Sequence, residues 1–403
     1  MGKTRIVAGL ALLVALLTAP FLWLRLNYDY NNGTLVAETS AHNAANFFSG
    51  LWPVLGFVAI FFVLRLIAKQ WPAPFRAGGD RLRTFAGFAS RPFAEWVLLA
   101  VALALAFVLP GRHVSSGFFV ALYMILALGL NVTVGFAGLL VLGYAGFYSL
   151  GGYAFALSAR AFPWMTWWMA LPGVFVVGAI AGWLVGLPCL RLRGDYLAIV
   201  TLGFSEGFRE LMRNLVQTGG DKGIIVPAQA KILPLGSMSS LQVAYCVAIL
   251  GVFATVALIR RLYDSRVGRA WIAIREDEIA AASMGIPVVR LKLQAFALSA
   301  GVAAVAGCIT IGFTGFIDPG ALGTFENSAL IVAMVILGGI GSIGGALLGA
   351  ALLYLIPAEL RNYYASAADY RLLLFGAIMV VMMLYRPQGL LGSKRHQLEI
   401  QGD

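Results

Sequence analysis

The sequence predicts an all-α, polytopic membrane protein with about 10–12 spans. Its 403 residues are 60% hydrophobic and only 12% charged, whereas soluble domains carry roughly 25% charged residues. Mean hydropathy is +0.86, and many apolar runs approach the roughly 20 residues that a helix needs to cross a bilayer. No polar stretch between these runs is long enough to hold an inserted soluble domain, which excludes a separate soluble catalytic domain.

The expected spans follow one another closely along the chain. They lie at about residues 6–24, 50–68, 94–110, 117–135, 139–159, 168–188, 195–208, 241–260, 291–313, 327–340, 343–357 and 371–385, with those at 195–208 and 327–340 short. The first run lacks a clear small-x-small cleavage site, so we interpret it as a retained span. Three plain spans form an N-terminal extension over 1–110, a glycine-rich core covers 111–393, and residues 394–403 form a tail.

The distribution of Lys and Arg predicts the orientation in the membrane. Basic residues concentrate in segments 69–91 and 260–292 and in the tail, while 26–49 and 314–326 contain none. Positive loops stay in the cytoplasm, so both termini are expected inside. The net charge of +11 then reflects membrane orientation rather than nucleic-acid binding, and we expect a lipid membrane and no nucleic acid among the partners.

Segment 268–286, within the most basic loop, predicts a charged helix outside the lipid. Four of its charges are consecutive and would encircle most of a helix. A run of small residues follows, then Gly285 as a helix stop and Pro287 as a barrier to continuation. Such a helix between two spans is typical of a docking element for a cytosolic partner. The candidate docking residues are Arg269, Arg275, Glu276, Asp277, Glu278, Ala281 and Gly285.

Glycine becomes dense after residue 117, most of all in 135–153 and 337–350. Small residues let helices pack closely and permit interrupted helices where protein or a water-filled cavity covers the backbone; both interpretations stay open. The two clusters occupy corresponding places in blocks 117–208 and 291–385, which suggests an inverted repeat. The candidate residues of interrupted helices or a transport pathway are Gly135, Gly138, Gly143, Gly146, Gly151, Gly338, Gly341 and Gly344.

Segment 191–214 pairs a short apolar piece with an amphipathic charged one. Glu206, Arg209, Glu210 and Arg213 have the spacing of helical ion pairs. One interpretation is an interfacial helix with surface salt bridges; the other is a gate or a contact for a binding protein at the outer mouth. Glu206 and Arg209, with Gly219 and Gly220 of the following loop, are the candidate residues of that contact.

Several kinds of chemistry are missing from the sequence. It contains no GxxxxGK[ST] loop for ATP and no HExxH motif, and its three cysteines and three histidines lack metal-ligand spacing. We therefore expect no catalytic residue, metal or cofactor, and any ATP would be hydrolysed by partner subunits. Ionisable residues within spans are few, which disfavours an ion-coupled secondary transporter. An ion-coupled transporter, an intramembrane enzyme and a structural subunit remain the alternatives.

Long ordered motifs resemble one family. These are GLNVTVGFAGLLVLGYAGFYSLGGYAFAL (129–157), LRLRGDYLAIVTLGFSEGFRELMRN (190–214), GRAWIAIREDEIAAASMGI (268–286), LGGIGSIGGALLGA (337–350) and YRPQGLL (385–391). Together they resemble the M-type permease subunit of branched-chain amino acid ABC importers over about 115–391. The outer loop TGGDKGI departs from relatives that often carry Pro-Asn between TGG and GI.

The resemblance implies a set of partners. Segment 268–286 would be the coupling helix, in which Glu278, Ala280, Ala281 and Gly285 occupy an EAA-type pattern, and it would dock on a cytosolic ATPase. The subunit would pair with a similar H-type permease, two ATPase subunits and a periplasmic protein that delivers leucine, isoleucine or valine across the bacterial inner membrane. Relatives in the family also move urea, short amides or other amino acids.

Overall fold

The computed structural model describes residues 25–29, 34–38, 111–162, 164–189, 195–232 and 239–363, together with residues 103 and 376. The chain divides into two units, Met1–Ser90 and Arg91–Asp403. This boundary precedes the third expected span, whereas the sequence analysis placed it at residue 110. The spans expected at 6–24, 50–68, 94–110 and 371–385 and the tail at 394–403 lie outside the described residues, apart from the single residues 103 and 376.

In the first unit, the described residues form an antiparallel hairpin. Strand β1 (Arg25–Asp29) pairs with β2 (Thr34–Glu38), with Arg25 opposite Glu38. Apart from Arg25, the two strands fall in the segment 26–49, which lacks basic residues.

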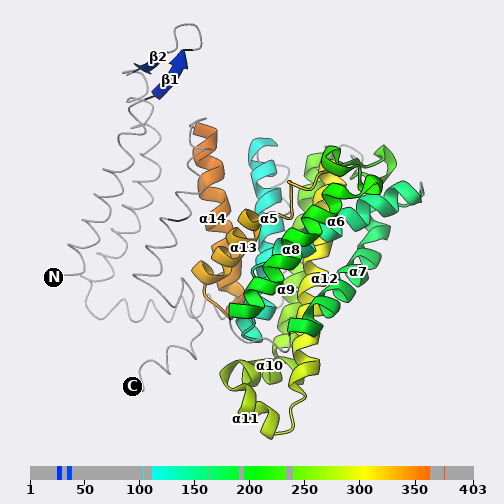
Figure 1. The fold of residues 1–403 in the computed structure, drawn as a ribbon, viewed down its shortest axis with the longest axis vertical. Helices are drawn as coiled ribbons and strands as arrows, with labels where there is room; N and C mark the ends of the chain where they lie inside the picture. The colour runs from blue at the N-terminus through cyan, green and yellow to red at the C-terminus, as the bar shows by residue number, and fades with distance from the viewer. Residues whose placement is uncertain are drawn as a thin grey trace, which may run out of the picture. The chain divides into compact units, whose positions relative to one another are not determined.

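The described residues of the second unit are almost entirely helical, which confirms the predicted all-α class. Its helices are α5 (Gly111–Asn131), the π-helix η1 (Val132–Phe136), α6 (Tyr144–Ala161), α7 (Trp167–Cys189), α8 (Asp195–Asn214), α9 (Ser240–Tyr263), α10 (Arg266–Glu276), α11 (Glu278–Ser283), α12 (Val288–Thr314), α13 (Phe325–Gly338) and α14 (Ile343–Tyr363) (Figure 1). Three 3₁₀ turns, η2 (Val216–Thr218), η3 (Gly220–Lys222) and η4 (Ala228–Ala230), precede α9, and β3 (Ile224–Ile225) pairs antiparallel with β4 (Phe316–Ile317).

Within the described residues, four helical segments are long and apolar enough to cross a membrane. They are His113–Phe136, Trp167–Pro188, Ser240–Asp264 and Val288–Thr314, and α13 and the first part of α14 are shorter apolar helices. The short span expected at 327–340 corresponds to the apolar helix α13, which is shorter than the four long segments. The short span expected at 195–208 and the amphipathic piece after it form one helix, α8.

Helix α12 is the centre of the bundle and packs against α5, α6 and α7. The contact with α7 depends on glycines spaced four residues apart, which lie on one helix face. A β-carbon added at Gly178 or Gly182 would clash with Ala304 or Ala300 of α12. Residues on the opposite face of α7, such as Ile180 and Leu184, are exposed, as expected for a helix side that faces lipid.

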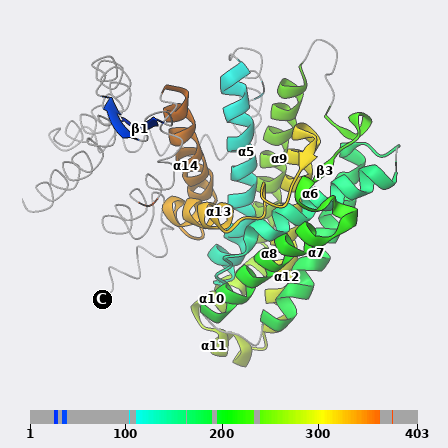
Figure 2. The same cartoon turned by 45° about the horizontal axis from the view of Figure 1, so that its top comes forward.

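The second unit has two distinct ends. Helices α5 and α9 run side by side in the same direction, since Gly117 faces Tyr245 and Ile125 faces Gly251. Helices α10 and α11 therefore project beyond the end of the bundle where α5 finishes, and β3–β4 lies at the other end (Figures 1 and 2). The basic loop 260–292 and the segment 314–326 without basic residues thus lie at opposite ends, consistent with the predicted orientation.

Candidate functional site

The charged segment predicted as one helix over 268–286 consists of two helices. Its first helix, α10, ends at Glu276, and Asp277 has an extended backbone with φ −152° and ψ 112°. The Asp277 carboxylate accepts hydrogen bonds from Ile279 N at 2.8 Å and Ala280 N at 2.9 Å. An aspartate that caps a helix N-terminus competes with continuation of the preceding helix. The prediction of a single helix is corrected for this reason.

The end of the second helix agrees with the predicted stop. Gly285 has φ +79°, and the amides of Gly285 and Ile286 donate to the carbonyls of Ala282 and Ala281. This is a glycine C-terminal motif, which favours a residue without a β-carbon. Pro287 then immediately precedes α12.

Two side-chain contacts attach this segment to the first turns of α12. Trp271 is 2% exposed, and its indole N–H donates to the carbonyl of Leu291 at 2.8 Å. The Lys292 ammonium, with only 9% of its side chain exposed, pairs with the Glu278 carboxylate at 2.7 Å. A force applied to α10 or α11 would therefore reach α12 directly.

Arg275 joins the same segment to the break between α5 and α6. Its guanidinium Nη1 donates to the carbonyl of Gly135 at 2.8 Å and Nη2 pairs with Glu276 at 3.3 Å. The side chain is 25% exposed, and a β-carbon on Gly138 would come within 2.7 Å of Arg275 Cγ. Arg275 therefore points into the bundle, although the sequence suggested a contact with a cytosolic partner.

Asn131 joins this break to the one between α13 and α14. It is completely buried; its Oδ1 accepts from Gly341 N at 2.9 Å and its Nδ2 donates to Ser342 O at 3.3 Å. Gly138 and Gly341 have φ +69° and +81°, a backbone that glycine adopts at little cost. The two predicted glycine clusters thus meet. We call Asn131, Gly135, Gly138, Arg275 and 341–342 the helix-break junction.

Sequence reasoning missed Asn131. The available signal was a single amide side chain at the end of an apolar run, directly before a glycine-rich stretch. A buried amide must find partners for its donors and acceptors, and freed backbone at a helix break supplies them.

Most of the remaining glycines pack helices closely. A β-carbon at Gly143 would clash with the backbone of Thr201, one at Gly151 with Ala304, and one at Gly338 with Gly345; at Gly146 it would lie 2.9 Å from Ser205 Cα. Gly344 is exposed in the first turn of α14. The assignment of these glycines to a pathway remains a prediction.

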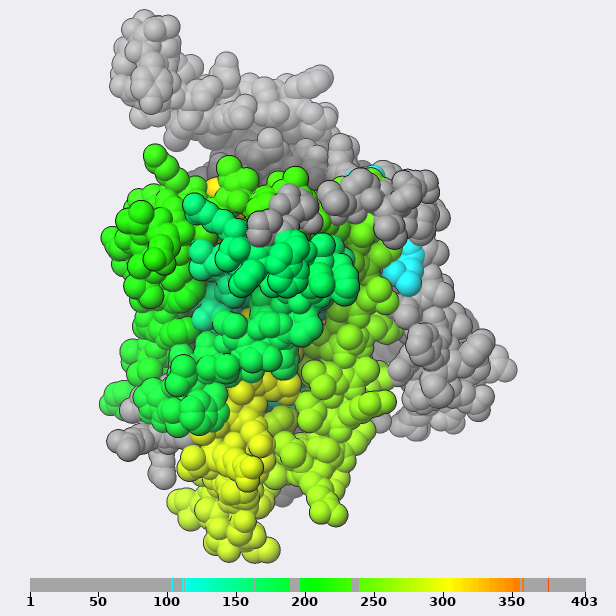
Figure 3. Space-filling model, turned by 90° about the vertical axis from the view of Figure 1, so that its right-hand side faces the viewer, coloured from blue at the N-terminus to red at the C-terminus, as the bar shows by residue number. Residues whose placement is uncertain are grey.

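The outward surface of α10 and α11 combines charged and apolar side chains. Arg269 donates to the carbonyl of Asp264 within the same loop at 2.8 Å, and the Glu276 side chain is 52% exposed. The most exposed large apolar residues here are Ile279, at 71%, and Met284, at 82%. They lie in the part of the chain that projects below the bundle in Figure 3. Neither residue is among the candidate docking residues predicted from the sequence, which were selected for their charge or their small side chains.

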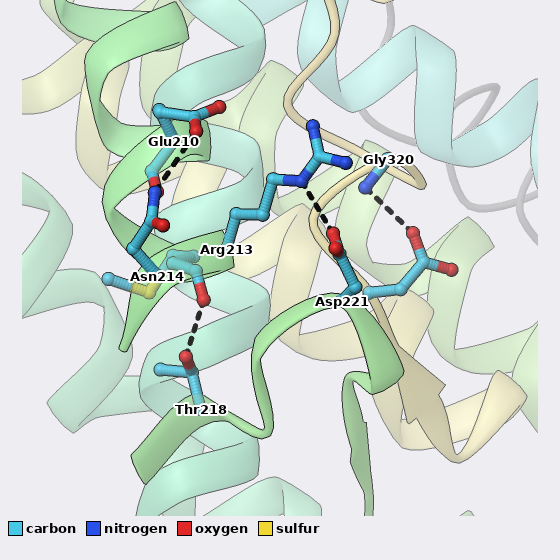
Figure 4. A network of polar contacts seen from close by, with 8 residues as sticks. Glu210, Arg213, Asn214, Thr218, Asp221 and Gly320 are labelled. Carbon is cyan, nitrogen blue, oxygen red and sulfur yellow. Dashed lines mark hydrogen bonds and ion pairs between the residues drawn. The ribbon is translucent and has the colours of Figure 1, made fainter. Parts of the chain in front are cut away.

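A second polar cluster lies at the β3–β4 end (Figure 4). Arg213 Nε donates to Asp221 at 2.6 Å, Thr218 donates to Met212 O, and the Asp318 carboxylate accepts from Gly320 N at 2.7 Å. The Arg213–Asp221 contact fixes the end of α8 against η3, and the Thr218 contact fixes it against η2. Gly219 and Gly220 form the turn with φ +75° and +56°.

The other two residues predicted for the outer contact lie nearer the start of α8. Glu206 and Arg209 form an ion pair at 2.7 Å, but neither reaches the cluster of Figure 4. In the described residues, no three His, Cys, Asp or Glu side chains are grouped so as to hold a metal ion.

Residues 113–383 match the family described as branched-chain amino acid transport system / permease component. The chain belongs to this permease family. Helices α6 to α14, all but the first two residues of α5, and both helix breaks lie within the matched residues.

Two kinds of named relative are similar to this permease. The high-affinity branched-chain amino acid transport system permease protein LivM of Salmonella typhimurium is 41% identical over 327 residues, covering 75% of this chain and 76% of the relative; LivM of Escherichia coli is 40% identical with the same coverage. LivH of Escherichia coli is 27% identical, covering 67% of this chain and 91% of its own length. No solved structure matched the permease.

Proposed function

We propose that this permease is a membrane subunit of an ATP-driven importer that carries leucine, isoleucine or valine inward across the bacterial inner membrane. The family and its named relatives support the transport activity and the solute class. The similarity to both LivM and LivH supports pairing with a second, similar permease. Two cytosolic ATPases and a periplasmic binding protein complete the proposed importer, and both termini of the permease are cytoplasmic.

The proposed coupling to an ATPase rests on the position of α10 and α11. They project from the bundle and expose Ile279 and Met284, while Trp271, Arg275 and Lys292 attach them to α12 and to the helix-break junction. An exposed apolar pair on a charged surface is suited to a protein contact, because its burial is favourable. We assign this surface to the ATPase.

The attachment points suggest how ATP-driven movement reaches the membrane. Displacement of α10 would shift Arg275 against Gly135, and Asn131 links that break to Gly341. Helix breaks can change conformation more easily than continuous helices, since their backbone hydrogen bonds are already interrupted. The proposed response is a concerted movement of the two breaks, which opens or closes the pathway between the two permeases.

The polar cluster at the β3–β4 end is proposed as part of the surface that receives the binding protein. Arg213 and Asp221 are exposed there, with side chains 48% and 69% accessible. Solute choice would depend on that binding protein, so urea, short amides or other amino acids are the alternatives within the same mechanism.

An ion-coupled transporter is the alternative from a different class. Such proteins usually place ionisable groups inside their spans, whereas the four long apolar helical segments of the described chain carry Asp, Glu, Lys or Arg only near their ends, at Arg260, Arg261, Asp264, Arg290 and Lys292. The described residues therefore favour an external energy source.

The test is purification of the permease with proteins encoded beside it. Recovery of a second permease and an ATPase, with a binding protein whose melting temperature rises with leucine, isoleucine or valine, is the expected result. A permease that purifies alone and transports leucine without nucleotide would contradict the proposal. A melting shift with urea or an amide alone would change the solute but retain the mechanism.

A further inference from the structure

Helix α8 presents an outward face that nothing in the described chain covers. The residues on this face recur at helical spacing: Tyr196, Ile199, Gly203, Gly207, Glu210 and Asn214, all exposed. Among the described residues, no atom lies within 4 Å of a β-carbon added at Gly203 or Gly207. The opposite face is packed, with Thr201 and Ser205 buried.

The depth of α8 follows from the helix on which it packs. Ser205 lies against Gly146, near the start of α6, and the Phe208 ring lies 6.2 Å from that of Tyr153. Tyr153 is eight residues before the end of α6, which corresponds to about 12 Å at 1.5 Å per residue. Glu206, between these two contacts, therefore lies within the bundle rather than at its end.

Lipid is an unsuitable cover for this face. The Glu206–Arg209 ion pair, with 36% and 32% of its side chains exposed, lies beside the two glycines, and Glu210 follows. Charged residues at membrane depth normally face protein or water. Helix α8 is also absent from the four apolar segments of the described chain that are suited to crossing a membrane.

Another helix of the same protein shows what such a glycine pair does when it is covered. On α7, Gly178 and Gly182 have the same four-residue spacing and are filled by Ala304 and Ala300 of α12. On α8, the same spacing is present and the partner is missing. Two small residues one turn apart allow close approach of another transmembrane helix.

We propose that the Gly203–Gly207 face of α8 is the packing surface for a transmembrane helix of the second permease. That helix would place small residues against the two glycines and a hydrogen-bond donor or a basic group against Glu210. The proposal rests on the proposed function, since it requires a paired permease, but it also assigns the surface at which the pair meets.

The first test measures assembly. Gly203→Leu and Gly207→Leu, each in a permease co-expressed with its neighbouring subunits, are expected to reduce co-purification of the second permease by about tenfold, the effect of about 1.4 kcal/mol. Gly173→Leu on α7 is the matched control, because Gly173 also has nothing within 4 Å but lies on an apolar helix. Unchanged co-purification for both α8 variants, or an equal loss for Gly173→Leu, would overturn the proposal.

The second test measures coverage of the face. In a background whose native cysteines are replaced by serine, Gly203→Cys should react with a membrane-permeant maleimide when the permease is expressed alone, and become protected when the second permease is present. Protection in the permease expressed alone would mean that its own chain or lipid already covers the face, since maleimide reacts only with a thiolate that water can reach. Reaction of the assembled complex with a membrane-impermeant thiol reagent would mean that the face lines a water-filled pathway. A cross-link between two differently tagged copies of this chain would identify a homodimer. Each of these three results contradicts the proposal.

Co-purification by the wild-type protein distinguishes failure of the proposed function from failure of the assigned α8 surface. If it recovers no second permease, the proposed function fails irrespective of α8. If it recovers one and the α8 variants do so equally well, only the assigned surface is wrong.

Discussion

The Arg275 guanidinium donates a hydrogen bond to the backbone carbonyl of Gly135 at 2.8 Å, across 140 residues of sequence. This bond connects a charged helix outside the bundle to the break that follows α5. Asn131 in turn binds the second break at Gly341 and Ser342. The Arg275 guanidinium therefore lies where three parts of the permease meet: helix α10, the break after α5 and the break between α13 and α14. We infer that this contact transmits movement rather than docking a partner.

Arg275→Ala is expected to separate ATP hydrolysis from transport. Loss of a charge-assisted hydrogen bond, about 1.5–3 kcal/mol, should leave assembly intact and reduce uptake at least about tenfold. Uptake and ATPase activity would be measured on the same reconstituted complex. Arg160→Ala is the control, since Arg160 is an exposed arginine in the last turn of α6, away from α10 and α11; equal transport by both variants would contradict the inferred transmission.

Asn131→Ala should destabilise the permease itself. The change removes the side-chain acceptor of the Gly341 amide, a partly buried donor, which costs about 1–3 kcal/mol. Thermal unfolding in detergent would report a lower midpoint, whereas Asn214→Ala, at an exposed position that bonds Glu210, should change stability by about 0.5 kcal/mol or less. Equal midpoints for the two variants would show that the junction contributes little to stability.

The helical fold was predictable from the sequence, but the junction was not. Hydrophobic runs located α5, α7, α9 and α12 within a few residues, because lipid demands long apolar helices. Asp277 divides the charged segment, because its carboxylate caps α11, a local competition that helix propensity alone does not reveal.

The sequence alone did not predict the contacts between residues that are far apart in the chain. Arg275 was predicted as a docking residue, and its contact with the bundle depends on the tertiary position of Gly135. Asn131 carried no motif. Ile279 and Met284 became notable only when their exposure at the α10–α11 tip was known.

Ile279→Asp and Met284→Asp should each weaken binding of the ATPase without unfolding the permease. Both side chains are largely exposed, so their replacement affects an interface more than the core. Removal of an apolar anchor from an interface commonly costs more than about 1 kcal/mol, and ATPase recovery should fall several-fold. Ile225→Asp, at an apolar residue 75% exposed at the other end, should leave recovery unchanged; an equal effect there would refute the assigned surface.

The Glu278–Lys292 pair predicts a charge-swap result. Glu278→Lys would place two ammonium groups together, one of them on a side chain only 9% exposed, and breaking such a pair leaves an uncompensated charge. We expect lower thermal stability and reduced transport, with most of both restored by adding Lys292→Glu. Additive losses in this double-mutant cycle would show that the two charges do not interact.

Trp271 should show a graded response. Trp271→Phe retains an aromatic ring but loses the hydrogen bond to Leu291 O, about 1 kcal/mol, while Trp271→Ala also creates a cavity and should cost about 3–5 kcal/mol. Protease sensitivity of the 264–290 segment and the unfolding midpoint would follow this order. Equal behaviour of both variants would mean that the indole N–H alone, rather than packing, holds α10 against α12.

The most direct test of the central claim is leucine uptake by proteoliposomes that contain the permease with its co-purified partners and binding protein. The account predicts that uptake requires ATP on the side of α10 and α11, and continues when a protonophore collapses the proton gradient. Uptake that proceeds without ATP and stops with the protonophore would contradict an ATP-driven importer.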